Sequence, residues 1–228
     1  MKRRIILGTA LTGLMALSTG IAGAETPPLE QKDRYKVGFA QMESNNPWRI
    51  AETKSFHDTA KTCNWDLIAT DAAGSAAKQV ADVDSMIAQG IDVLFLPPRE
   101  EKPLIPAVMK AKAAGIPTFL VDRSVDPNVA KPGEHFVAFL GSDFIDQGER
   151  AADWLIANFE GDKGVIVELE GTTGSSPAND RKKGFDDQIA TDDRFEIVAS
   201  QTGDFARDMG RQVMETLLQA HPEVNVVY

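Results

Sequence analysis

The sequence predicts an α/β fold made of two doubly wound lobes, each with its own parallel sheet. Two observations support this prediction: short apolar runs alternate with amphipathic stretches, and the series restarts once near residue 142. Nearly continuous apolar strands are typical of parallel sheets that helices cover on both faces. One repeat of the series therefore indicates two layered lobes in one chain.

In the first lobe, strands and helices alternate from residue 36 onward. The predicted strands are Lys36–Ala40, Asp66–Thr70, Asp92–Leu96, Pro117–Val121 and Phe136–Leu140, and the predicted helices are Pro47–Thr62, Ser75–Gln89 and Pro103–Ala114. Asn46 before Pro47 is a good N-cap followed by a good first helical residue. Gly90 and Gly115 follow helices in the position that C-terminal caps favour.

The second series has the same alternation and predicts the second lobe. Its helices are Asp143–Phe159, Pro177–Ile189 and Ala206–Ala220, and its strands are Gly164–Leu169, Phe195–Ala199 and Val224–Tyr228. We place the boundary at Gly141-Ser142, which gives lobes over residues 35–141 and 142–228. Because the last strand has no turn or helix after it, we expect a longer protein and an incomplete second lobe.

Residues 1–24 have the pattern of a secretory signal peptide. Three basic residues precede an apolar stretch from Ile5 to about Leu17, and Ala-Gly-Ala at positions 22–24 fits a cleavage site. A membrane anchor is the weaker interpretation, because the apolar run is short and interrupted by polar and glycine residues. We expect a periplasmic protein with a flexible lead-in over residues 25–34.

The composition argues against several classes of function. The formal net charge is −10, which disfavours nucleic acid and anionic membranes as partners. Cys63 is the only cysteine, so an intrachain disulfide is impossible, and we expect its side chain to be buried. The three histidines lie far apart in the sequence, which disfavours a metal site.

No cofactor is predicted. The segment Gly171–Ser176 is rich in Gly, Thr and Ser and opens a helix, but it lacks the Gly-Lys-Ser/Thr ending of a phosphate-binding loop and the G-x-S-x-G of a serine nucleophile. No G-x-G-x-x-G follows the first strand. We interpret Gly171–Ser176 as a tight turn that lets the backbone approach a ligand.

The loops that follow the strands carry the candidate site, because open α/β sheets bind ligands at the carboxyl ends of their strands. These loops contain Trp48, Arg49, Asp122, Arg123, Arg181 and Phe205. Aromatic faces pack against the C–H face of a sugar, and Arg and Asp make charge-assisted hydrogen bonds to hydroxyls. The set therefore favours a small polyol as ligand.

Six blocks of sequence carry a resemblance to a known family. They are residues 45–49 (NNPWR), 90–93 (GIDV), 117–124, 168–171 (ELEG), 181–185 (RKKGF) and 200–205 (SQTGDF). The chain resembles the periplasmic sugar-binding proteins of ABC transporters, of the ribose-binding type I family. The Trp48-Arg49 pair is most similar to galactofuranose-binding proteins, since ribose binders tend to carry two Phe there and an Asn at the position of Pro97.

The resemblance implies a role for each candidate residue. Trp48 and Phe205 would stack on the sugar from the two lobes, Thr172 would line the pocket, and Arg49, Asp122, Arg123 and Arg181 would bind hydroxyls. It also implies hinge closure around a monosaccharide, a permease in the inner membrane as partner, a monomer, and no catalytic residues or cofactor.

Other interpretations stay open at this point. Trp48 and Phe205 could be core residues, Asp122 and Arg123 could form a structural ion pair, and Arg49 and Arg181 could be solvated. We expect Trp65 and Trp154 to pack in the core or between helices.

The function of the whole protein also has alternatives. The protein could bind another pentose or hexose and serve chemotaxis or sensing. A transcription regulator would need a basic DNA-binding head where the signal peptide stands, and a sugar-processing enzyme would need two placed carboxylates.

Overall fold

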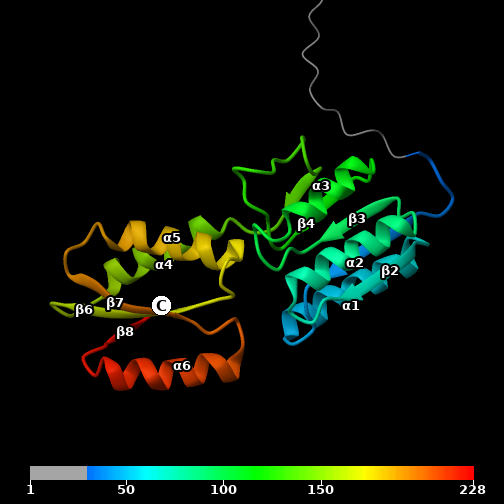
Figure 1. Cartoon of the computed structure of the whole chain (residues 1–228). Coiled ribbons are helices and arrows are strands. Elements are labelled where there is room, and N and C mark those ends of the chain that lie inside the picture. Colours follow the sequence, from blue (N-terminus) through cyan, green and yellow to red (C-terminus); the bar gives the residue numbers. More distant parts are fainter. Residues whose placement is uncertain (1–29) are drawn as a thin grey trace, which may run out of the picture.

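The computed structural model describes residues 30–228, so the predicted signal peptide and half of the predicted lead-in lie outside the described residues. The chain forms two α/β units that lie side by side (Figure 1). Each unit has a parallel sheet with helices on both faces, which confirms the predicted fold class.

The first sheet has five parallel strands in the order β2-β1-β3-β4-β5. Its strands are β1 Lys36–Gln41, β2 Asp66–Asp71, β3 Val93–Leu96, β4 Thr118–Val121 and β5 Ala138–Leu140. The strand order reverses between β1 and β3, and this switch point is where doubly wound sheets bind ligands. The loop after β1 therefore opens onto a natural binding position.

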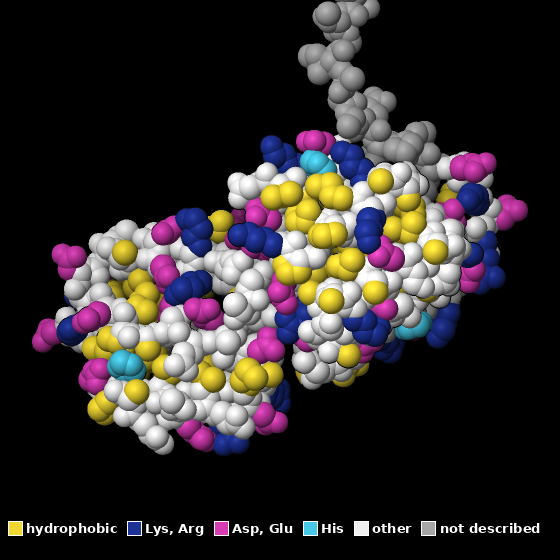
Figure 2. All heavy atoms as spheres, viewed as in Figure 1, with side chains coloured by type: hydrophobic (Ala, Val, Ile, Leu, Met, Phe, Trp, Pro, Cys, Tyr) yellow, Lys and Arg dark blue, Asp and Glu magenta, His cyan; other side chains and the backbone are white. Residues whose placement is uncertain are grey.

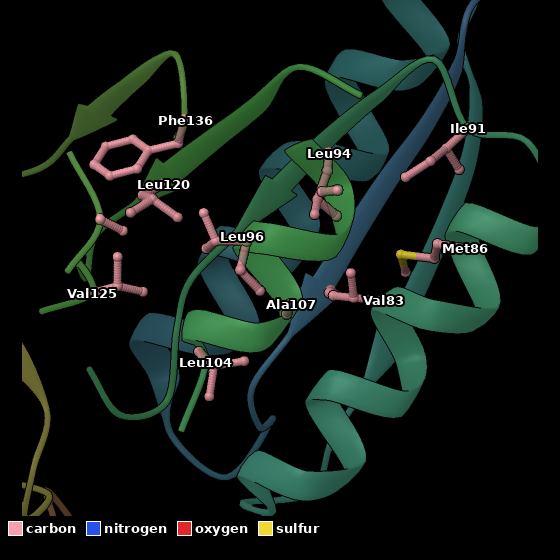
Figure 3. Packing of buried hydrophobic residues seen from close by; sticks show 14 residues of the cluster. Val83, Met86, Ile91, Leu94, Leu96, Leu104, Ala107, Leu120, Val125 and Phe136 are labelled. Atoms are coloured by element: carbon pink, nitrogen blue, oxygen red, sulfur yellow. The ribbon is translucent and has the colours of Figure 1, made fainter. Parts of the chain in front are cut away.

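Three helices cover this sheet: α1 Pro47–Thr62, α2 Ala76–Ala88 and α3 Ile105–Ala113. Val83 and Met86 of α2, and Leu104 at the N-cap of α3, are buried in one cluster with Leu94 and Leu96 of β3 (Figure 3). Each such side chain contributes about 1.5–3 kcal/mol on full burial. Helix α1 brings an aromatic side chain of its own to the sheet, where the Phe56 ring stacks on Phe39 of β1 at 3.9 Å.

The second sheet has three parallel strands in the order β7-β6-β8, which repeats the arrangement of the first three strands of the first lobe. Its elements are α4 Phe144–Asn158, β6 Gly164–Glu170, α5 Ser176–Ile189, β7 Phe195–Thr202, α6 Arg207–Ala220 and β8 Val226–Val227. Helices α4 and α5 lie on one face and α6 on the other (Figure 1). Phe185 of α5 is buried and stacks on Tyr228 at 3.7 Å.

Two predictions about single residues are wrong. Cys63 is exposed, because it caps the C-terminus of α1, where its backbone N–H donates to Thr59 O. Trp154 is 67% exposed, because the buried positions of α4 are Phe144, Gly148 and Ala152, on another side of the helix. Trp65 does pack as expected, with its ring 6.2 Å from that of Phe95.

Most element boundaries differ from the prediction by one to three residues. Helix α3 begins at Ile105 rather than Pro103, with Pro106 in its first turn, where a missing N–H does no harm. Strand β8 contains only two residues, and β7 extends three residues further, to Thr202. Gly90 and Gly115 follow their helices with φ of 71° and 70°, as predicted for C-terminal caps.

The surface carries charges of both signs. In the face shown in Figure 2, acidic and basic side chains are intermixed, with scattered apolar side chains between them. Within residues 30–228, no helix has the length and apolar character needed to cross a bilayer.

Candidate functional site

A cavity of about 540 Å³ lies between the two units. Six of the seven predicted site residues line it, namely Trp48, Arg49, Asp122, Arg123, Arg181 and Phe205. The other lining residues are Asn46, Pro47, Ser142, Phe144, Gln147 and Pro177. The cavity volume is suited to a small molecule, and both units contribute to its wall.

The loop between β1 and α1 positions Trp48. Asn46 caps α1, because its Oδ1 accepts a hydrogen bond of 3.0 Å from the backbone N–H of Arg49. Pro47 then starts the helix, and Trp48 follows in the first turn. The Trp48 side chain is 65% exposed, which excludes the alternative of a core residue and leaves its ring available at the cavity.

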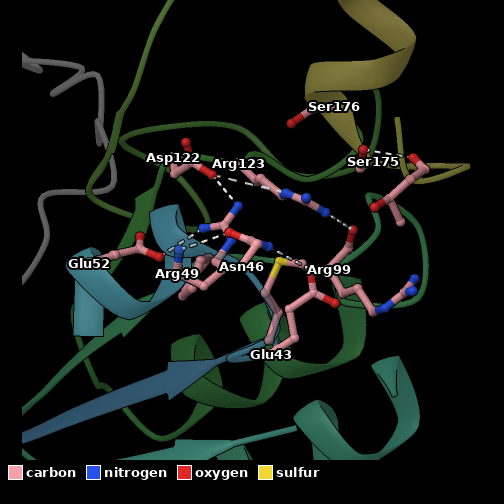
Figure 4. A network of polar contacts seen from close by, with 12 residues as sticks. Glu43, Asn46, Arg49, Glu52, Arg99, Asp122, Arg123, Ser175 and Ser176 are labelled. Atoms are coloured by element: carbon pink, nitrogen blue, oxygen red, sulfur yellow. Dashed lines mark hydrogen bonds and ion pairs between the residues drawn. The ribbon is translucent and has the colours of Figure 1, made fainter. Parts of the chain in front are cut away.

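Arg49 is held by two carboxylates. Its guanidinium donates to Glu52 Oε2 at 2.7 Å and to Asp122 Oδ2 (Figure 4). The Arg49 side chain is buried, so these charge-assisted bonds offset the cost of removing the cation from water. This contact joins the first turn of α1 to the loop after β4.

Asp122 and Arg123 follow β4 directly. Asp122 has a φ of +61°, a left-handed conformation that is uncommon outside glycine. The nearest charged partner of Asp122 is Arg49, while Arg123 Nε lies 4.0 Å away. The predicted Asp122–Arg123 pair is therefore the weaker of the two contacts.

Arg123 is buried, and its Nη1 donates to the carbonyl oxygen of Arg99 at 2.9 Å. Burial, and then the neighbouring Arg49 cation, lower the pKa of Arg123 to about 10. At neutral pH it stays protonated. Its guanidinium carbon lies 5.4 Å from the centre of the Phe205 ring, so a cation–π contact connects the two units at the cavity.

Phe205 lies in the loop between β7 and α6. Asp204 and Phe205 both have a φ of +52°, and Asp122 on the facing loop shares this left-handed conformation. Strained backbone of this kind collects at functional sites. A Cβ atom on Gly171 would lie 1.9 Å from the Phe205 ring, so the ring needs a glycine at this position. The turn that we predicted to admit a ligand thus admits the Phe205 ring.

Arg181 lies on α5 and faces residues that the sequence interpretation missed. Its Nε donates to Gln147 Oε1 at 2.9 Å, and its guanidinium lies 4.5 Å from the Phe144 ring. Burial lowers the pKa of Arg181. Both partners, Gln147 and Phe144, come from the start of α4. The only feature of the sequence that could have indicated them is their position directly after the fifth strand.

Thr172 does not line the cavity. Its side chain is buried in the turn between β6 and α5, and its Oγ1 has no hydrogen-bond partner in the described structure. The carbonyl of Thr172 accepts from the Ser175 hydroxyl at 2.7 Å, a contact that closes the turn and draws Thr172 inward. Ser176 then accepts a hydrogen bond of 2.8 Å from the backbone N–H of Ser124 in the first unit.

The arrangement suits a small polar ligand. The wall has three aromatic side chains, of which Trp48 and Phe205 come from opposite units, together with three guanidinium groups and one carboxylate that form directional hydrogen bonds. In residues 30–228, no group of three or more His, Cys, Asp or Glu side chains could hold a metal ion.

A cleft between two α/β lobes, lined by aromatic, arginine and aspartate side chains, is the architecture expected of the two-lobed class of solute-binding proteins. Residues 37–228 match the periplasmic binding protein domain, and the chain belongs to this family. The members that it resembles are binding proteins rather than enzymes.

Two curated relatives illustrate the similarity. The chain is 38% identical over 184 residues to the galactofuranose-binding protein YtfQ of Escherichia coli, covering 81% of this chain and 57% of that protein. It is 32% identical over 197 residues to the ribose import binding protein RbsB of Bacillus subtilis, covering 86% of this chain and 62% of the relative. The chain thus spans about three fifths of the length of these relatives.

Solved structures give the same result. A galactofuranose binding protein superposes with a TM-score of 0.79 at 36% identity, covering 85% of this chain and 66% of the other. A protein from Mycobacterium smegmatis in complex with β-D-fucofuranose superposes with a TM-score of 0.78 at 39% identity, covering 85% and 63%. These similarities confirm the type I periplasmic binding protein fold.

Proposed function

We propose that the protein is the sugar-binding component of an ABC importer and traps a monosaccharide between its two lobes. The observation that carries this proposal is the pairing of Trp48 from one lobe with Phe205 from the other around a single cavity. Aromatic faces on two sides of a cavity favour a flat, partly apolar ring. The lobe boundary at Gly141-Ser142 belongs to the same proposal.

The proposed binding residues are Trp48, Arg49, Asp122, Arg123, Arg181 and Phe205. The two ring residues would stack on the sugar, and Arg181 and Asp122 would bond its hydroxyls. Arg49 is occupied by two carboxylates, so its main contribution would be to orient Asp122. Thr172 would act through the shape of its turn rather than through direct contact.

We favour a galactofuranose-like sugar as the ligand. Support comes from the Trp48-Arg49 pair, from the relative named for galactofuranose, and from the similar structure that holds a fucofuranose. We further propose a periplasmic location after cleavage of residues 1–24, a monomeric state, and a membrane permease as partner. A role in sensing another pentose or hexose is the second candidate, supported by the ribose-binding relative.

A thermal-shift screen tests this function. The protein is heated with a panel of monosaccharides that includes D-galactose, L-arabinose, D-ribose and D-fructose. A ligand that binds the native state alone raises the melting temperature in proportion to ln(1 + [L]/Kd). We expect a shift with at least one sugar and no turnover of it. Conversion of the sugar would favour an enzyme, and no shift with any member would contradict the proposal.

A further inference from the structure

The surroundings of Arg181 differ from those of the other arginines in the cavity wall. Arg49 and Arg123 lie within ion-pair distance of Asp122, whereas no ion pair joins Arg181 to a described carboxylate. Gln147 takes its Nε hydrogen, and the Phe144 ring lies against its guanidinium. Among the described residues, no acceptor is bonded to its two terminal amino groups, which are therefore available to a ligand.

A close contact between two helices brings Gln147 to Arg181. A Cβ atom on Gly148 of α4 would lie 2.2 Å from the carbonyl oxygen of Arg181, and one on Gly184 of α5 would lie 2.2 Å from that of Ile145. Such distances are far below van der Waals contact, so the two backbones touch. The glycine next to Gln147 thus places the amide within 2.9 Å of Arg181 Nε.

We propose that Gln147 is a positioning residue that aims the terminal amino groups of Arg181 at two neighbouring hydroxyls of the bound sugar. This inference rests on the proposed function. An arginine side chain loses considerable rotamer freedom when it is ordered, and a partner that orders it before binding removes this cost from the binding step. The planar guanidinium then offers two parallel donors, a geometry that fits adjacent oxygen atoms.

The neutral amide is the important feature of this partner. A carboxylate at position 147 would form a bidentate ion pair and occupy the donors of Arg181. Gln147 instead accepts one hydrogen bond and leaves the remaining donors free.

A double-mutant cycle tests the proposal by calorimetry, with the sugar that gives the largest response in the monosaccharide panel. Gln147→Ala is expected to weaken binding roughly tenfold, and Arg181→Ala more strongly. If Gln147 acts through Arg181, adding Gln147→Ala to Arg181→Ala should change affinity less than about twofold. Gln147→Met, which keeps the length without the acceptor, serves if the alanine variant folds poorly.

Gln188→Ala is the matched control, because Gln188 Nε2 donates to Asp153 at 2.6 Å and forms another hydrogen bond between the same two helices. Neither residue lines the cavity, so affinity should stay within about twofold of the unsubstituted protein. Additive losses in the Gln147/Arg181 cycle, or an equal loss in Gln188→Ala, would overturn the inference alone. Absence of binding by the unsubstituted protein would overturn the proposed function and this inference with it.

Discussion

Arg49 and Asp122 lie 73 positions apart in the chain and are joined by a charge-assisted hydrogen bond in the wall of the cavity. Because Arg49 also holds Glu52, one buried cation organises two carboxylates from different elements. The Asp122 carboxylate therefore has a structural partner and, in the proposed function, a sugar hydroxyl as its ligand. Both uses predict measurable consequences for the same substitution.

Asp122→Asn should lower both affinity and stability. Asparagine tolerates the left-handed φ of +61°, so the variant changes charge without straining the backbone. Hydrogen bonds to charged groups contribute about 1.5–3 kcal/mol each, which predicts a loss of sugar affinity of roughly tenfold or more. Weakening the bond to Arg49 should lower the melting temperature without sugar by about 3–8 °C.

Asp146→Asn provides the control for Asp122→Asn in thermal scans and titrations. Asp146 pairs with Arg150 at 3.4 Å on the exposed face of α4, where such pairs contribute little. It should leave melting temperature and affinity unchanged. If Asp122→Asn behaves like this control, the carboxylate is neither an anchor for Arg49 nor a contact for the sugar.

Gly148→Ala should destabilise the second lobe. Its Cβ would meet the Arg181 carbonyl at 2.2 Å, so α4 and α5 must separate. Overpacking of this kind costs about 1–3 kcal/mol, measurable by urea unfolding. Gly210→Ala in α6 is the matched change, because its Cβ would meet only Leu169 Cδ2 at 3.4 Å. Equal midpoints for the two variants would mean that the α4–α5 contact is looser than described.

The surroundings of Glu168 predict that the stability of the protein depends on pH. Burial, followed by the neighbouring Asp186, raises the pKa of Glu168 above its ordinary value of 4.5, while Lys182 acts in the opposite direction. A raised pKa means that the native state holds the proton more tightly than the unfolded state. The stability that this proton adds is complete below pH 4.5 and is lost as the pH rises through the raised value.

Glu168→Gln keeps the shape of the protonated acid and cannot titrate. Its melting temperature should therefore improve relative to the parent as the pH is raised from 4.5 to neutrality. Differential scanning calorimetry of both proteins across this range gives the comparison. A difference that does not change with pH would show that Glu168 keeps the same protonation state in the folded and unfolded chains.

Cys63 should react with a thiol reagent in the native protein. Its side chain is exposed at the end of α1, and it is the only thiol in the chain. Ellman's reagent should therefore release one equivalent at a similar rate with and without denaturant. If the reaction required denaturant, Cys63 would be buried, as the sequence suggested.

The order of strands and helices could be predicted because each apolar run has a length and periodicity that local sequence records. Gly90 and Gly115 marked helix ends for the same local reason. Trp154 and Cys63 were misplaced because the outward side of α4 and the end of α1 depend on what packs against each helix. A residue type favours burial only on average.

Six of the predicted site residues line the cavity, because the loops and helix starts that follow parallel strands meet at one edge of the sheet. Gln147 and Phe144 were missed since their approach to Arg181 depends on a glycine contact between α4 and α5. The Arg49–Asp122 bond was missed for a related reason. Sequence spacing gives no information about which of several nearby cations a carboxylate will choose.

The most direct test of the proposed sugar site is a calorimetric titration of the protein and of Trp48→Ala with the monosaccharide that shifts the melting temperature most. Trp48 is 65% exposed, so its removal should leave the melting temperature without sugar unchanged. We predict one-to-one binding by the parent and a loss of at least about tenfold in the variant, because stacked aromatic anchors dominate such sites. Equal affinity in the two proteins, or no binding of any monosaccharide by the parent, would contradict a sugar site built on Trp48.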